Sequence, residues 1–330
     1  MSNNVIGMVL IDAPYSALNN AGTQAGQATE NIVVVKTLRK GSQIYPYVSG
    51  QAWRNWWRGT LGEEFSWQLS PIEREKKIAF TAASPVEYDD DDVFGYMRAE
   101  KKDTLTRLSP LKCSPLIATA PQRPTDDFGV MARHEGDPVP YEHQFYSCVL
   151  KGIFSLDLDA VGAFWDINKT GYQNINEGYV STIEGAGGAR TDEHSPWMLP
   201  KEIRIRRARQ TIEALSLLSG GAKLTSHLTD VTPKLIILTV LEGGNHPFMN
   251  LIVEEDGAGK LSISALQQVI NDYTNRITDL VYIGRREGFM DELEEPLRGL
   301  AGELPNQIVY SSPNHAVAQL ADRIESHIGG

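Results

Sequence analysis

Three short runs rich in apolar and β-branched residues limit this chain to folds with an internal sheet. They are Val5–Ile11, Ile32–Leu38 and Leu235–Leu241. Each run predicts a strand, and Val5–Ile11 is apolar at successive positions, so both faces of that strand should be buried. All three are far shorter than the roughly 20 residues of a membrane-spanning helix. The chain is therefore expected to build a buried sheet rather than to cross a membrane.

Helices are predicted between these strands from their start signals and periodicity. Ser49 is a candidate N-cap for a helix that runs to about Leu61, and Pro71–Phe80 reads as a short helix. Ile203–Leu218 and Asn314–His327 carry apolar residues at helical spacing. Further elements are expected as strands at Gln144–Asp159, Met249–Val253 and Leu280–Ile283, and as a helix from about Leu261 to Asn275. Strands separated by single helices favour an α+β core over a doubly wound sheet.

Two long segments interrupt this pattern. Ser84–His143 contains seven prolines and an acidic run, Glu87–Asp92, without a sustained period. A structureless loop of that length is uncommon inside a compact domain, so an inserted subdomain is predicted. Trp165–Leu199 contains the glycine-rich sequence EGAGGAR at 184–190. This second insertion is predicted to be a long hairpin or arm with a flexible tip.

Composition and charge restrict the function. Apolar residues make up 41% of the chain and charged residues 22%, which is typical of soluble globular proteins. With 31 Lys and Arg against 42 Asp and Glu, the net charge is −11, so a surface for nucleic acid would have to be a local basic patch. Two cysteines, Cys113 and Cys148, make neither a disulfide framework nor a four-ligand zinc site. Free thiols are typical of a reducing compartment, and a cytoplasmic protein is expected.

Positive charge is concentrated in two places. The stretch from Asn31 to Leu61 contains no acidic residue, and its cations are Lys36, Arg39, Lys40, Arg54 and Arg58. The stretch 201–209, KEIRIRRAR, has five cations and one Glu. Both are compatible with contact to a phosphate backbone. For 201–209, a solvated helix face is an equally good interpretation.

The predicted helix after Ser49 carries two kinds of side chain. Trp53, Trp56 and Trp57 share one side, where a place in the core is preferred over stacking on bases. Arg54 and Arg58 lie one turn apart on a neighbouring side. They serve either solubility or the binding of successive phosphates, which the free N–H groups of the helix start would assist.

Common catalytic motifs do not occur in the sequence. There is no P-loop, no zinc-protease helix and no nucleophile elbow. Asp89–Asp92 lacks the spacing of a calcium loop and is predicted to be a solvated acidic loop. We expect no metal site and no cofactor.

Several segments taken together resemble the Cas-seven family of CRISPR backbone subunits, in its DevR-like, type I-B branch of the RAMP superfamily. The segments are LNNAG (18–22), VVVKTLRKG (33–41), YPYVSGQAWRNWWRG (45–59), FGYM (94–97) and GGAK (220–223). Their order and spacing match over roughly Val5 to Leu241.

The resemblance implies an α+β fold with a modified RRM-like, ferredoxin-like palm and inserted fingers and thumb. The palm would comprise 1–83, a strand at 144–162, and 202–330. The fingers would be 84–143, and the thumb arm 163–201.

The resemblance also implies a non-catalytic role in antiviral defence. Copies of such a protein form a helical filament along one CRISPR RNA within a Cascade complex, together with other subunits. The thumbs displace bases at intervals, and the remaining bases pair with target DNA, so that pairing rather than the protein reads the sequence.

Ten residues match positions that contact RNA in this family. Ser49, Gln51, Arg54 and Arg58 lie on the predicted helix, and Asn19 and Asn20 follow the first strand. The remaining four are Lys36, Gly220, Gly221 and Lys223. The glycines are expected to let the backbone approach a phosphate closely.

Two other functions stay open. Type III relatives cut RNA with an aspartate in the loop after the first strand, but Ala13–Thr29 contains no acid and Asp12 lies at the end of the strand. A DNA-binding transcriptional regulator is suggested only by the autoregulator label of relatives, and no helix-turn-helix pattern supports it.

Overall fold

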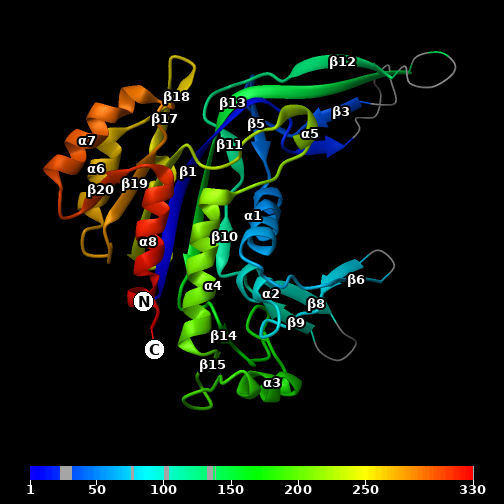
Figure 1. The fold of residues 1–330 in the computed structure, drawn as a ribbon, viewed down its shortest axis with the longest axis vertical. Coiled ribbons are helices and arrows are strands. Elements are labelled where there is room, and N and C mark those ends of the chain that lie inside the picture. The colour runs from blue at the N-terminus through cyan, green and yellow to red at the C-terminus, as the bar shows by residue number, and fades with distance from the viewer. Residues whose placement is uncertain (23–31, 76–77, 100–103, 132–136, 138, 330) are drawn as a thin grey trace.

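A large mixed sheet forms the centre of the molecule (Figure 1). The computed structural model describes residues 1–22, 32–75, 78–99, 104–131, 137 and 139–329. The sheet is built around β1 (Asn3–Ser16), which pairs antiparallel with β13 (Val139–Asp157) and β16 (Leu235–Glu242). The main order is β20-β19-β16-β1-β13-β11-β5-β4. The outer strands are β20 (Ile308–Ser311), β19 (Val281–Arg285), β11 (Leu116–Ala118), β5 (Gln43–Val48) and β4 (Thr37–Lys40).

Strand β1 is buried on both faces, as its sequence predicts. Val5, Val9 and Ile11 pack into one core cluster, and the alternating residues Ile6 and Met8 pack into another. The first cluster lies under α1 (Gly50–Glu64), α4 (Lys201–Glu213) and α8 (Pro313–His327). The second lies under α6 (Ile263–Asp272) and α7 (Glu294–Glu303). The α+β class is therefore confirmed, with helices on both faces of the sheet.

The tryptophans of α1 belong to the core. Trp53 and Trp57 are fully buried and Trp56 nearly so. Trp57 donates to the carbonyl of Thr211 in α4, and Trp53 to that of Ser114. The preferred interpretation of these side chains is thus confirmed, and it fixes α1 against the sheet by one face.

Strand β13 continues beyond the main sheet. Together with β12 (Thr125–Met131) it forms a hairpin that projects from the top of the molecule in Figure 1. Two short strands, β2 (Asn20–Gly22) and β3 (Ile32–Val35), lie along this hairpin, with β3 parallel to β13. The predicted strand Ile32–Leu38 is therefore divided between β3 and β4, and the break falls at Lys36.

Ser84–His143 mixes elements of the sheet with elements outside it. β10 (Leu111–Cys113) and β11 pair with β13, whereas α2 (Asp89–Phe94), β8 (Tyr96–Ala99) and β9 (Thr104–Arg107) lie outside the main sheet. The solvated acidic loop predicted at Asp89–Asp92 is wrong, because all four aspartates are buried in α2.

The predicted helix at Pro71–Phe80 is also wrong. This segment forms an antiparallel hairpin of β6 (Ile72–Glu75) and β7 (Ile78–Thr81). Its Glu, Arg and Lys side chains favour helix locally. Pairing between the two strands, together with the contact of Arg98 from β8 with Phe80 and Glu73, favours the hairpin instead.

The segment 163–201 has a small core of its own. β14 (Ala163–Phe164) pairs with β15 (Trp197–Met198), and η1 (Glu177–Tyr179) and α3 (Val180–Gly185) lie between them. The residues of this core are Phe164, Ile175, Ile183, Trp197 and Leu199. The predicted flexible tip is instead packed, since a Cβ on Gly188 would lie 2.6 Å from Ile183. The segment is compact rather than an extended arm.

The C-terminal third follows the prediction in part, and α7 lies where the sequence predicts no element. Pro247–Asn250 is a 3₁₀ turn, η3, so the strand expected at Met249–Val253 begins only at β17 (Ile252–Glu255), which pairs with β18 (Ala258–Leu261). β20 was not predicted, and it pairs parallel with β19. The remaining short elements are η2 (Ala214–Leu217), α5 (Leu224–His227) and η4 (Asp291–Leu293). Across the described residues, no helix combines the length and apolar character needed to cross a membrane.

Candidate nucleic-acid interface

The start of α1 is held by the turn that follows β1. Ser49 is the N-cap, and its Oγ accepts a hydrogen bond from the amide of Ala52 at 3.3 Å. The amide of Ser49 donates to Oδ1 of Asn19 at 3.0 Å. Gly50 follows in close contact with the sheet, where a Cβ would lie 2.8 Å from the carbonyl oxygen of Cys113. Asn19 and Ser49, both predicted site residues, therefore meet.

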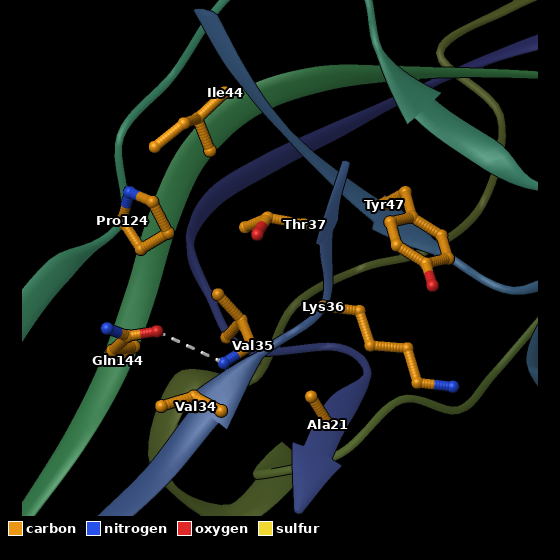
Figure 2. Close-up of a pocket in the computed structure, with 9 residues that line it drawn as sticks. All are labelled: Ala21, Val34, Val35, Lys36, Thr37, Ile44, Tyr47, Pro124 and Gln144. Atoms are coloured by element: carbon orange, nitrogen blue, oxygen red, sulfur yellow. Dashed lines mark hydrogen bonds between the residues drawn. The ribbon is translucent and has the colours of Figure 1, made fainter. Parts of the chain in front are cut away.

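The backbone of Lys36 is bonded to the same turn. Its amide donates to the carbonyl of Asn19 at 3.0 Å, and its carbonyl accepts from the amide of Tyr47 at 3.0 Å. The Lys36 side chain borders a hollow of about 380 Å³. Figure 2 shows Lys36 and Tyr47 to the right of this hollow and Gln144 and Pro124 to its left.

The Gly220–Gly221 turn packs against Trp56 of α1 and against Leu18. Both glycines have positive φ, +150° and +107°. A Cβ on Gly220 would lie 2.5 Å from Cγ of Trp56, and one on Gly221 would lie 2.6 Å from Leu18. The amide of Ala222 then donates to the carbonyl of Leu18 at 3.0 Å, and Lys223 follows with φ +58°. Close packing against Trp56 and Leu18 is thus enough to explain why both positions are glycine.

These contacts bring most of the predicted residues into one group, which we call the helix-start cluster. It comprises Asn19, Asn20, Lys36, Ser49, Gly220, Gly221 and Lys223. Gln51 lies beside it, exposed in the first turn of α1. Oδ1 of Asn20 is buried and has no hydrogen-bond partner among the described residues. Lys36 and Lys223 form no ion pair with any described residue.

Arg54 and Arg58 point to a different place. Nη2 of Arg54 donates to the carbonyl of Phe94 at 2.6 Å and to Oγ of Ser109 at 2.9 Å. Nε of Arg58 contacts Oδ2 of the buried Asp90 at 2.5 Å. The contact with phosphate stays a prediction for both residues, but the structure gives each a partner around α2 instead. Neither is a free surface charge.

The second basic stretch, 201–209, is also used internally. Arg207 is buried in α4 and contacts Asp89 at 2.6 Å and Asp92 at 2.7 Å. Arg206 contacts Asp89 at 2.8 Å, and Arg209 is paired with Glu213. A phosphate footprint of five available cations is therefore wrong, and so is a fully solvated helix face, because Arg204 and Arg207 are buried and Arg206 and Arg207 hold α2 against α4.

The protonation of Asp89 reflects this network. Burial alone would raise its pKa, but the hydrogen bond from Arg206 and the charges of Arg207 and Arg206 together lower the pKa below the ordinary value. An ionised Asp89 is thus the stable form at neutral pH. Asp89 and Asp92 of the acidic run and Arg206 and Arg207 of the second basic stretch therefore form one network of ion pairs.

Sequence reading missed a row of rings next to the helix-start cluster. Tyr141, His143 and Phe145 alternate along β13 and so lie on one face of it. Tyr15 from β1 and His227 from α5 complete the row. The sequence does show a ring at every second position of 141–145, but many strands without a binding role have the same pattern. Elsewhere, no group of three or more His, Cys, Asp or Glu suited to a metal ion occurs among the described residues.

Comparison with known proteins connects this arrangement to one family. A family model described as CRISPR-associated negative auto-regulator DevR/Csa2 matches residues 9–260. No curated protein matches the chain.

Two solved structures share the fold over nearly the whole length. One, titled "CRISPR RNA-guided surveillance complex, pre-nicking", has a TM-score of 0.57 and 14% identity, covering 97% of this chain and 100% of that one. Another, titled "CRISPR RNA-guided surveillance complex", has a TM-score of 0.54 and 12% identity, covering 97% and 98%. At these identities the likeness is one of fold.

Proposed function

This chain belongs to the CRISPR-associated DevR/Csa2 family, and we propose that it is a non-catalytic subunit that binds guide RNA in a Cascade-type surveillance complex. Several copies would line one CRISPR RNA in the cytoplasm, next to other subunits. The protein would hold the RNA backbone, and the exposed bases would pair with target DNA.

The helix-start cluster is the observation that carries this proposal. It gathers the N-terminus of a 15-residue helix and two lysines without a carboxylate partner in the described chain. A helix start and free cations attract phosphate. None of these contacts requires a particular base, which suits a subunit that must accept any guide.

The charge distribution favours the same surface. Strand β4 contributes Arg39 and Lys40, which are exposed and form no ion pair among the described residues, and it lies directly after Lys36. By contrast, the arginines of α4 are largely neutralised by aspartates of α2 and by Glu213. On a chain with a net charge of −11, unpaired cations at one sheet edge supply the local attraction that a polyanion needs.

The proposal that the protein is not an enzyme rests on the segment that follows Asp12. Asp12 itself lies inside β1, opposite Val149 of β13 in the strand register. The described part of the following stretch, 13–22, contains no acid. The rest of the acid-free stretch Ala13–Thr29 lies outside the described residues.

Charge removal at the cluster tests the proposal. Replacing Lys36 and Lys223 together by Ala should weaken RNA binding, and the slope of log affinity against log salt should fall by about 1.4, or about 0.7 for each lost phosphate contact. The matched control replaces Lys112 and Lys201, which also form no ion pair in the described chain, and should leave the slope unchanged. Equal slopes for both double variants would refute the assignment of the cluster.

The description of the family as a negative auto-regulator suggests one alternative, a DNA-binding regulator. Such a protein would bind short duplex DNA with fixed stoichiometry. A guide-binding subunit would instead bind single-stranded RNA, with a stoichiometry that grows with RNA length. Titration of both nucleic acids by sedimentation separates the two functions.

A further inference from the structure

A continuous row of rings borders the helix-start cluster, and we call it the ring ladder. Tyr141 and His143 stack with centroids 6.0 Å apart and an interplanar angle of 17°. His143 and His227 are 6.2 Å apart, His227 and Phe145 are 6.2 Å apart, and Phe145 and Tyr15 are also 6.2 Å apart. The ladder thus joins three segments, β13, α5 and the end of β1.

The hairpin is shaped to accommodate the ladder. Gly129 in β12 lies opposite Tyr141 in the strand register. A Cβ at Gly129 would lie 2.1 Å from Cζ of Tyr141, so the Tyr141 ring lies across the backbone of the neighbouring strand. The other face of the hairpin carries Phe128, which is 73% exposed and takes no part in the ladder.

Strained backbone surrounds the same surface. Tyr15, Lys223 and Leu228 have φ values of 48°, 58° and 49°, which are unfavourable for residues other than glycine. Tyr15 is nevertheless 68% exposed and Leu228 79% exposed. Strained backbone clusters at sites that bind ligands or partners, which makes this surface a candidate.

The ladder also contains unused polar atoms. Nδ1 of His143 and Nε2 of His227 are buried and have no hydrogen-bond partner in the described part of the chain. Burial, and then the charges of His143 and Lys223, lower the pKa of His227, so its ring is neutral at pH 7. The neutral His227 ring combines an aromatic face with an open donor or acceptor, whereas Nε2 of His143 lies 3.2 Å from Oδ2 of Asp127.

We propose that the ring ladder stacks unpaired bases of the bound RNA strand, with Lys223 beside its backbone. This inference rests on the proposed function and extends it from the RNA backbone to its bases. Aromatic faces next to cations bind single strands without sequence preference. The positive charge of Lys223 beside His227 suits a phosphate backbone rather than an apolar patch of a second protein copy.

The test compares two probes of equal length, an unstructured RNA oligonucleotide and the same ribose–phosphate backbone with abasic sites. Tyr15→Asn removes the ring, and Asn tolerates the positive φ of this position, so the fold should persist. We expect Tyr15→Asn to weaken binding of the RNA by about fivefold or more and to leave binding of the abasic probe unchanged. Phe145→Leu, which keeps an apolar side chain, should act in the same direction.

Two variants serve as controls. Tyr15→Phe keeps the ring and should bind as the wild type does. Phe128→Ala, on the opposite face of the hairpin, should also leave binding unchanged. Because no phosphate contact is lost in any of these variants, the salt slope should stay constant.

The outcomes separate this inference from the proposed function. Wild-type protein that binds neither probe would refute the proposed function and with it the inference. Wild-type protein that binds both probes equally, with no effect of Tyr15→Asn, would refute only the ring ladder. Loss of self-association by Tyr15→Asn without a change in RNA affinity would likewise overturn it, in favour of contact between copies.

Discussion

The side chain of Asn19 accepts a hydrogen bond at 3.0 Å from the backbone amide of Ser49, 30 residues further along the chain. The bond connects the turn after the central strand to the N-cap of α1. It satisfies the backbone amide of Ser49. The carbonyl of the same Asn19 accepts from the amide of Lys36, so Asn20 and Lys36 are positioned next to this bond. Together with the bond from the amide of Lys36 to the carbonyl of Asn19, this contact holds the strand side and the helix side of the cluster together.

Two substitutions of Asn19 separate its structural role from its electrostatic one. Asn19→Ala removes the acceptor and should lower the free energy of unfolding by about 1 kcal/mol. Asn19→Asp keeps the acceptor, so stability should stay near that of the wild type, but its negative charge should weaken RNA binding. Denaturant unfolding and RNA titration measure the two effects. If Asn19→Asp bound RNA as tightly as the wild type, phosphate would not approach this turn.

Arg58 and Asp90 should behave as a coupled pair in stability. Asp90 is buried and also accepts from the amide of Ser70 at 2.8 Å. Arg58→Ala would leave this carboxylate without its cation, at a cost of about 2 kcal/mol. A double-mutant cycle with Asp90→Ala should give a coupling energy of about 1 kcal/mol or more. The exposed Arg39, replaced by Ala, should change stability little.

The opposite result for Arg58 would restore its assignment to RNA. Near-zero coupling with Asp90, together with a reduced salt slope for RNA binding in Arg58→Ala, would show that the guanidinium is available to phosphate. The residues alone leave solubility and phosphate binding open for this arginine, and the family resemblance implies the contact with RNA.

Gly220 should tolerate no side chain. Gly220→Ala would place a Cβ 2.5 Å from Trp56 in addition to the strained φ of +150°, and should destabilise the protein by about 2 kcal/mol or more. Gly41→Ala is the matched control, because its φ is +59° but nothing lies within 4 Å of the added carbon. It should show only the smaller cost of the strained backbone. Equal effects of the two substitutions would mean that the turn does not pack on Trp56.

Asp279 should make stability depend on acid pH. Burial would raise its pKa, but hydrogen bonds from His327, the amide of Leu280, Tyr282 and Arg323 lower the pKa from 3.8 to about 2. The carboxylate is therefore ionised more readily in the folded state, and its contribution is lost as pH falls from about 4 through about 2. The contribution is at most about 2 kcal/mol, since one pKa unit corresponds to about 1.4 kcal/mol.

Asp279→Asn provides the comparison for this pH dependence. The variant should be less stable than the wild type at neutral pH, and the difference should shrink as the pH is lowered toward 2. Thermal unfolding across this range measures it. Parallel stability curves for the two proteins would contradict the assigned shift.

Local patterns in the sequence were sufficient for the elements nearest the site. The Ser49 N-cap, the continuous burial of Val5–Ile11 and the apolar stripe of Ile203–Leu218 are all observed. Each depends on neighbouring residues, through capping or periodicity. The same information placed Trp53 and Trp57 in the core.

Pairing between distant residues could not be predicted in this way. Asp89 and Arg207 are 118 residues apart, and each run of charge looked solvated until the fold brought them together. Ile308–Ser311 is too short to stand out, and its role as a strand depends on β19 beside it. At the site, the family resemblance named the residues of the helix-start cluster together with Arg54 and Arg58. Only the structure shows that these two arginines point away from the cluster, toward α2 and Ser109.

The most direct test of the account is to identify the nucleic acid that the protein carries. Protein purified from cells that express its CRISPR array should be extracted, and the extract sized and sequenced after treatment with RNase or DNase. The account predicts single-stranded RNA of defined length that contains repeat-derived sequence joined to varied guide segments. Protein free of nucleic acid, or protein that carries only short duplex DNA, would contradict it.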